Sequence, residues 1–158
     1  MLGEPEWLLI HVLGEEAVGD RLAAAPFRAE AFSRWIRDYA ASTYRQISSQ
    51  GEDPALSGLI NVVTVDVEPE HAGAFSRWYD DVHVPEILDC PGWLGARRYR
   101  SIDHDGCFMA VYGLEDAERP FGTAEYEEAT GWDEHVEHIR GYHGFRIYRI
   151  VTLLEGSE

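Results

Sequence analysis

The run LINVVTVDV at residues 59–67 constrains the fold of this chain more than any other segment. Its density of β-branched residues over a short length is typical of a strand with a buried face. Residues 93–102, 107–114 and 145–154 have strand character too, and residues 70–88 and 124–140 show helical spacing of apolar side chains. The order from residue 59 onward is therefore β-α-β-β-α-β, which predicts an α+β, ferredoxin-like domain.

Local signals refine this order. Pro85 lies inside the first helical segment and removes a backbone donor, so we expect a bend or break near His83. The turn Asp103-His104-Asp105-Gly106 predicts a hairpin, because Gly106 tolerates the positive φ that such turns need. Thr123 suits the N-cap of the second helix.

The first 58 residues form an N-terminal β-α extension in this interpretation, and residues 59–158 form the ferredoxin-like domain. We expect a strand at residues 7–13, a helix at 27–47, and a linker at 48–58, which is polar and contains Gly and Pro. The pentapeptide AFSRW occurs at residues 31–35 and again at 74–78. It is either a coincidence between two amphipathic helices or the remnant of a duplicated domain.

The charge of the chain excludes some partners. Its 158 residues carry a formal net charge of −16, which disfavours binding to nucleic acid and to anionic membranes. The two cysteines form no C-x-x-C pair, so no zinc knuckle or redox motif is indicated. The apolar run near the N-terminus lacks a basic leader and is too short to span a bilayer, so we expect a cytoplasmic protein.

The segment FSRWYDDVHVPEILDCPGWLGARRY at residues 75–99 contains the densest set of reactive side chains. His83 is the leading catalytic candidate, because imidazole exchanges protons near neutral pH. Asp80 and Tyr79 lie three and four residues earlier, so either could share its helix face, Asp80 to orient the ring and Tyr79 to bind substrate. The alternative is that His83 caps the helix or pairs with Asp80 on the surface.

The strand after this helix offers groups that could bind a substrate. Arg97 and Tyr99 share one face of it and Arg98 takes the other. An Arg that faces a pocket could stabilise an enolate or phenolate, although an ordinary ion pair is equally compatible with the sequence. Further candidates for substrate contact are aromatic residues that could instead be part of the core: Trp78, Tyr112 and Tyr148.

The sequence gives little support for a metal or cofactor, and we expect none. Pairs of ligand-type residues at helical spacing occur among Glu134, His135, His138 and His143, but they provide at most two ligands from one face. His83, His135 or His138 could be an axial haem ligand. No glycine-rich phosphate loop and no nucleophile motif is present in the sequence.

The pattern within residues 75–99 resembles EthD-like and antibiotic-biosynthesis-monooxygenase-like members of the dimeric α/β-barrel superfamily. The matching positions are Phe75, Trp78, Tyr79, His83, Pro85, Pro91, Gly92 and Tyr99. The resemblance covers roughly residues 59–155 and implies a ferredoxin-like subunit, a homodimer, and a pocket between the sheet and the helices. Activities in this superfamily range from cofactor-free monooxygenases to cyclases, decarboxylases, isomerases and haem enzymes, so the resemblance does not fix the reaction. The N-terminal extension departs from the basic unit and puts the usual dimer geometry in doubt.

Three hypotheses for function follow. The first is a cofactor-independent enzyme that uses His83 as general acid or base in cyclisation, dehydration, isomerisation or decarboxylation of a small aromatic or polyketide-like substrate. The second is a cofactor-free, quinone-forming monooxygenase on the same scaffold. The third is a non-catalytic module that binds a small molecule or haem.

Overall fold

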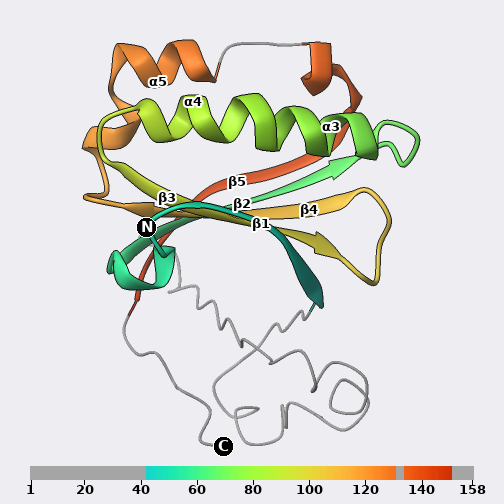
Figure 1. Ribbon diagram of the computed structural model, residues 1–158, viewed down its shortest axis with the longest axis horizontal. Helices are drawn as coiled ribbons and strands as arrows, with labels where there is room; N and C mark the ends of the chain where they lie inside the picture. Colours follow the sequence, from blue (N-terminus) through green and yellow to red (C-terminus); the bar gives the residue numbers. More distant parts are fainter. Residues whose placement is uncertain (1–41, 131–133, 151–158) are drawn as a thin grey trace, which may run out of the picture. The chain divides into compact units, whose positions relative to one another are not determined.

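The computed structural model describes residues 42–130 and 134–150, and its core is an antiparallel sheet covered by helices on one face (Figure 1). The strand order is β1-β3-β4-β2-β5, and every neighbouring pair is antiparallel. The strands are β1 (Tyr44–Gly51), β2 (Leu59–Val67), β3 (Trp93–Ser101), β4 (Cys107–Leu114) and β5 (Ile139–Arg149). The helices are α3 (Ala72–Trp78), α4 (Val84–Asp89) and α5 (Ala124–Ala129), with short 3-10 helices at Pro54–Leu56, Arg119–Phe121 and Glu134–His138. The β-α-β-β-α-β order predicted from residue 59 is confirmed.

Strand β1 corrects two predictions. We expected a helix as far as residue 47 and a linker from residue 48, but Tyr44–Gly51 pairs along the edge of β3. The segment is polar because it is an edge strand with mostly exposed side chains, and edge strands need no continuous apolar face. Backbone pairing with β3 decides its conformation. The predicted strand at 7–13, the helix over 27–41 and the first AFSRW copy lie outside the described residues, so the repeat stays a prediction.

The second helix is shorter than predicted. Thr123 is its N-cap as expected, because its hydroxyl accepts a hydrogen bond from the backbone N–H of Tyr126 at 3.2 Å. The helix ends at Ala129, however, and Ile139 already begins β5, where we expected helix to residue 140 and strand from residue 145. Residues 139–149 pair with β2, so the backbone hydrogen bonds offered by the free edge of β2 outweigh the helical spacing of the sequence.

The hairpin between β3 and β4 is confirmed. Gly106 has φ +84°, and a Cβ there would lie 2.2 Å from the carbonyl oxygen of Val67. Only glycine fits this position without displacement of the backbone.

Alternation along the strands separates two apolar clusters. The larger one lies between the sheet and the helices and includes Phe75, Val84, Ile87, Phe108 and Leu114. The smaller one contains Ile60, Val62 and Val111, whose side chains alternate with those of the larger cluster along β2 and β4. The two faces of the sheet therefore have separate apolar clusters.

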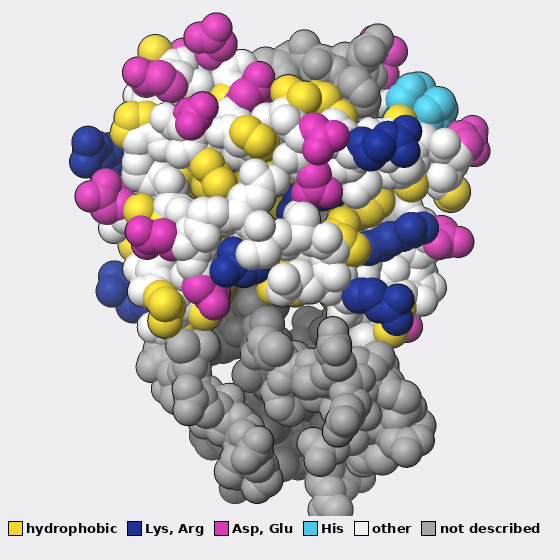
Figure 2. Space-filling view, viewed as in Figure 1, with side chains coloured by type: hydrophobic (Ala, Val, Ile, Leu, Met, Phe, Trp, Pro, Cys, Tyr) yellow, Lys and Arg dark blue, Asp and Glu magenta, His cyan; other side chains and the backbone are white. Residues whose placement is uncertain are grey.

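Within the described residues no helix is both long and apolar enough to cross a membrane. Acidic and basic side chains are interspersed over the face seen in Figure 2.

Candidate active site between the helices and the sheet

A π-helical turn, Tyr79–His83, joins α3 to α4 and presents the catalytic candidates. The backbone N–H of Val84 donates to the carbonyl of Tyr79, five residues back. In this register Pro85 would be the donor to Asp80, but proline has no N–H. The side chain of Gln50, on β1, replaces it and donates to the Asp80 carbonyl at 2.8 Å. The regular α-helix is therefore interrupted at this point, as Pro85 predicts, but by a π turn through which the helix continues and not by a break of the chain's helical path.

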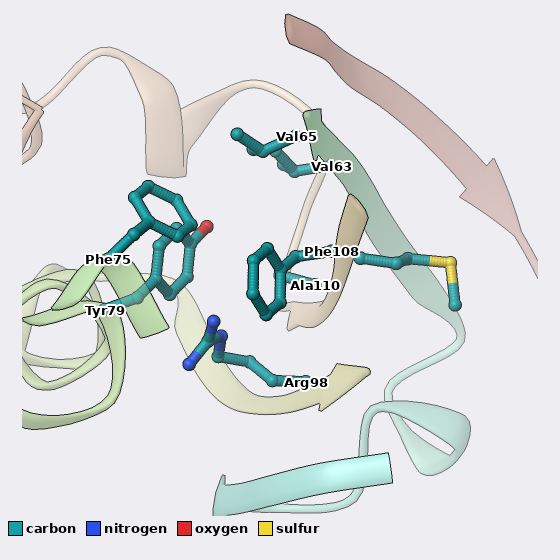
Figure 3. Close-up of a pocket in the computed structure, with 8 residues that line it drawn as sticks. Val63, Val65, Phe75, Tyr79, Arg98, Phe108 and Ala110 are labelled. Atoms are coloured by element: carbon teal, nitrogen blue, oxygen red, sulfur yellow. The ribbon is translucent and has the colours of Figure 1, made fainter. Parts of the chain in front are cut away.

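Arg98 is the central charged group on the helix-covered face. Its side chain is 1% exposed, and Nη1 lies 2.6 Å from a carboxylate oxygen of Asp80 and 2.9 Å from the carbonyl of Ser76. Its guanidinium carbon lies 4.3 Å from the centre of the Tyr79 ring, and Figure 3 shows the group turned toward that ring. Within the described residues, Nη2 is buried without a hydrogen-bond partner. A buried donor that lacks a partner is costly unless a ligand supplies one.

Asp80 acts on Arg98 and not on His83. One of its carboxylate oxygens pairs with Arg98, and the other accepts a hydrogen bond from the Ser48 hydroxyl. Both oxygens are thus engaged by groups on β1 and β3. The predicted role of Asp80 as the residue that orients the imidazole is not what this geometry provides, because the π turn directs Asp80 toward the sheet.

His83 packs against aromatic rings and is largely removed from water. Its ring stacks on Trp78 with centroids 5.1 Å apart. It also lies edge-on to Tyr79, with ring centroids 4.6 Å apart. Desolvation, together with the nearby positive charge of Arg98, lowers the pKa of His83 from 6.5 to about 4, although a hydrogen bond to the backbone of Ala129 opposes the shift. The imidazole is therefore neutral at physiological pH and available as a proton acceptor.

Two tyrosines on facing elements form a buried pair beside His83. The hydroxyl of Tyr112 on β4 donates to the hydroxyl of Tyr79 at 2.9 Å. Burial is the main cause that raises the pKa of both phenols, so both stay neutral. A neutral phenol can donate a hydrogen bond to an anionic oxygen.

A small space opens beside Arg98 and Tyr79 (Figure 3). It is about 170 Å³ in volume with its open mouth included, and it is lined tightly enough that no water molecule fits. The lining residues are Val63, Val65, Phe75, Tyr79, Arg98, Phe108, Met109 and Ala110. Apart from Tyr79 and Arg98 the lining is apolar, which suits a hydrocarbon skeleton that carries one acidic oxygen. A substrate of aromatic size requires side chains of the lining to move.

Three of the predicted substrate contacts lie elsewhere. Tyr99 and Tyr148 pack against the smaller cluster on the opposite face of the sheet. Arg97 is partly exposed and donates to backbone carbonyls of Glu52 and Ala96. The strand alternation that separated Arg97 from Arg98 is confirmed, and it directs Arg98 to the pocket. Trp78, by contrast, is half-buried against the core and contacts His83, as predicted for a site residue or a core residue.

Several residues of this site were not identified from the sequence. Ser48 and Gln50 belong to the segment that we interpreted as a linker. Asn61 is also buried on this face, where its amide nitrogen lies 3.5 Å from the Arg146 carbonyl and its amide oxygen has no partner among the described residues. Its position between apolar residues of β2 was the only available signal.

The metal candidates are arranged differently from the prediction. The side chains of Glu134, His135 and His143 lie outside the described ones. His138 instead meets Glu68 and His71, two residues that precede the first helix and were not considered as ligands. Glu68 and His71 are only three residues apart, but no sequence spacing connects them to His138, because β5 must first pair with β2 to bring it there.

Comparison with known proteins gives a fold but no family. No family model matches the chain, and no curated protein matches it. Among solved structures, a major regulator of staphylococcal pathogenesis superposes with a TM-score of 0.54 at 15% identity, over 73% of this chain and 72% of that one. The fold is ferredoxin-like.

Two further structures agree with this ferredoxin-like assignment. A proposed monooxygenase from Lactobacillus acidophilus has a TM-score of 0.55 at 14% identity, over 83% of this chain and 63% of that one. Another from Fusobacterium nucleatum has a TM-score of 0.50 at 12% identity, over 82% and 65%. The match thus spans just under two thirds of the length of both proteins. The fold implied by the resemblance to the dimeric α/β-barrel superfamily is confirmed, and at these identities the comparison carries no activity with it.

Proposed function

We propose that this chain is an enzyme that moves a proton on a small, mainly apolar substrate with an acidic oxygen, such as a phenol or an enolisable carbonyl. The observation that carries the proposal is the buried Nη2 of Arg98, which has no partner within the described residues and belongs to a side chain that lines an otherwise apolar pocket. A phenolate or enolate oxygen is the ligand that such a donor lacks.

The proton acceptor in this proposal is His83. Burial and Arg98 disfavour its cationic form while the pocket is empty. His83 does not line the pocket itself, but its ring contacts Tyr79, which does. In this proposal a substrate that loses a proton to His83 leaves an anion near both groups, and that anion stabilises the imidazolium and the guanidinium together. His83 then returns the proton to another atom of the substrate, so the enzyme neither gains nor loses a proton over the reaction. Since the imidazole begins neutral at physiological pH, it acts first as a base.

The remaining groups position this pair. Asp80 and Ser48 hold Arg98 through the ion pair and the hydrogen bond described above. The Tyr79–Tyr112 pair offers a hydroxyl to the same region. The π turn at Tyr79–His83 supports a functional role, because π turns are often retained at functional sites despite their weaker geometry.

A quinone-forming monooxygenase is the second candidate. The anion of a hydroxylated aromatic is the form that reacts with O₂, one oxygen atom becoming the quinone carbonyl and the other leaving as water. The names of the two proposed monooxygenases with this fold favour this alternative. In both candidates the chain's own contribution is to form and hold the anion.

The test uses 1,3-dihydroxynaphthalene in D₂O, because ring carbons next to its hydroxyls exchange hydrogen when the phenol ionises. NMR follows exchange, and an oxygen electrode follows O₂ consumption. We expect the protein to accelerate exchange, and we expect His83→Phe, which preserves the stack on Trp78, to lower the acceleration by about 100-fold. O₂ consumption that exceeds the protein-free rate would favour the monooxygenase.

Arg97→Ala is the matched control, because Arg97 lies on the opposite face of β3. It should leave the exchange rate unchanged. Binding of the probe without any exchange or O₂ consumption above the protein-free rate would contradict the enzyme proposal and favour a non-catalytic binding module. Exchange that survives His83→Phe would contradict the role of His83.

A further inference from the structure

Glu68, His71 and His138 form a cluster at the end of the sheet, outside the pocket lining. Glu68 follows β2, His71 is the N-cap of α3, and His138 ends the 3-10 helix that precedes β5. Backbone hydrogen bonds fix the three residues: the N–H of Glu68 donates to the His138 carbonyl at 3.2 Å, and the N–H of His71 donates to the Glu68 carbonyl at 2.9 Å. The cluster therefore rests on a defined framework.

The side chains bring three possible ligand atoms together. Nε2 of His71 lies 3.8 Å and Nδ1 of His138 lies 3.9 Å from the same carboxylate oxygen, Oε2 of Glu68. All three ligand atoms lie within 4.8 Å of one another. Around a tetrahedral Zn²⁺ with ligand distances of about 2.1 Å, neighbouring ligand atoms are about 3.4 Å apart. The distances between ligand atoms must shorten by only a few tenths of an ångström at the carboxylate.

The two imidazoles need a larger adjustment. Their rings are parallel with centroids 3.4 Å apart, so their in-plane lone pairs do not yet converge on one point. Both side chains are 38% exposed and the Glu68 side chain is 35% exposed, which leaves room for the rings to turn and for water to complete the coordination. Histidine side chains also reach the edge of the surface seen in Figure 2.

Arg140 positions the carboxylate. Its Nε lies 3.5 Å from Oε1 of Glu68, the oxygen that neither histidine contacts. Oε2 is thus left available as a metal ligand. Carboxylates that bind metals commonly receive such a hydrogen bond or ion pair on the oxygen that does not contact the metal. The positive charge of Arg140 also repels a bound cation. Because its side chain is 55% exposed, water screens this repulsion.

We propose that Glu68, His71 and His138 bind one divalent transition-metal ion of the Zn²⁺ class. Two imidazole nitrogens and one carboxylate oxygen suit Zn²⁺, Ni²⁺ or Cu²⁺, whereas Mg²⁺ and Ca²⁺ prefer oxygen ligands alone. The ion would connect the β2–α3 junction to the start of β5. This site is independent of the proton-transfer proposal.

The experiment titrates Zn²⁺ into the full chain, prepared without a polyhistidine tag and stripped with EDTA, by isothermal calorimetry. We expect one ion per chain and no binding of Mg²⁺. Zinc at about 100 times its dissociation constant should raise the melting temperature by roughly 5–10 °C, because the ion binds the folded state alone. Co²⁺ at the same site should give visible absorption bands.

Single variants locate the ion. His71→Ala and His138→Ala should each weaken Zn²⁺ binding at least 10-fold and abolish the rise in melting temperature. His104→Ala is the matched control, because His104 lies exposed in the β3–β4 turn, and its affinity for Zn²⁺ should equal that of the wild type. No Zn²⁺ binding, or binding that survives both cluster variants, would overturn the proposal. Loss of such surviving binding in Cys107→Ser would place the ion at that cysteine instead.

Discussion

The two faces of this sheet differ in what their polar groups do. On the helix-covered face, Arg98 and Asn61 are each 1% exposed, and the guanidinium of Arg98 lies over the ring of Tyr79. On the opposite face, Arg97 remains partly exposed at the side of an apolar cluster. Adjacent residues of β3 thus place equal charges in very different environments. A charge that is kept from water must have partners, and where one partner is missing a ligand can supply it.

The largest difference between the faces should appear in stability when each arginine is removed. Arg98→Met leaves the partly buried Asp80 without its ion pair, and we expect the free energy of unfolding to fall by about 3 kcal/mol. Arg97→Met should change it by less than about 0.5 kcal/mol, because its contacts are exposed hydrogen bonds to backbone carbonyls. Urea denaturation followed by circular dichroism measures both.

A double variant separates the lost ion pair from lost packing. If an uncompensated carboxylate causes the loss, Asp80→Asn should recover part of the stability in the Arg98→Met background. Equal losses for Arg98→Met and Arg97→Met would refute the contrast between the faces.

The sequence was sufficient for the β-α-β-β-α-β order but only for part of the site. The β-branched run at 59–67, the Gly106 turn and the strand alternation around Arg98 are local signals, and the structure follows them. They could not reveal β1, because an edge strand with polar side chains has the composition of a linker. They could not place the start of β5 either, since the free edge of β2 determines its pairing.

The site depends on those non-local contacts. His83, Tyr79 and Tyr112 were accessible as candidates because each lies on an element with clear periodicity. The assignment of Asp80 failed because i, i+3 spacing assumes an α-helix, and the π turn changes which residues share a face. Ser48 and Gln50, which hydrogen-bond to Asp80, lie on β1, the strand whose polar composition led us to predict a linker.

The burial of His83 on the helix-covered face predicts that the stability of the protein depends on pH. Because the pKa of His83 falls from 6.5 to about 4 on folding, the unfolded chain binds more protons between these values, and stability is lost as pH falls through this window. His83 should make the protein less stable at pH 5 than at pH 7 by about 2 kcal/mol. Urea denaturation of wild type and His83→Phe at both pH values isolates this contribution.

One result would contradict this prediction. All other titratable groups are common to wild type and His83→Phe, so their contributions to the loss of stability cancel in the difference. An identical loss of stability between pH 7 and pH 5 in wild type and His83→Phe would mean that water reaches the imidazole on the helix-covered face.

The smallest predicted difference concerns hydroxyl groups on the two faces. Tyr112→Phe removes the buried donor to Tyr79, so one buried phenol loses its partner, and we expect a loss of about 1–2 kcal/mol in the free energy of unfolding. Tyr99→Phe on the opposite face should cost less than about 0.5 kcal/mol. Tyr79→Phe combined with Tyr112→Phe should cost less than the sum of the single variants, because no unpaired hydroxyl then remains. Additive losses would show that the two hydroxyls are satisfied separately, and the covered face would hold no coupled tyrosine pair.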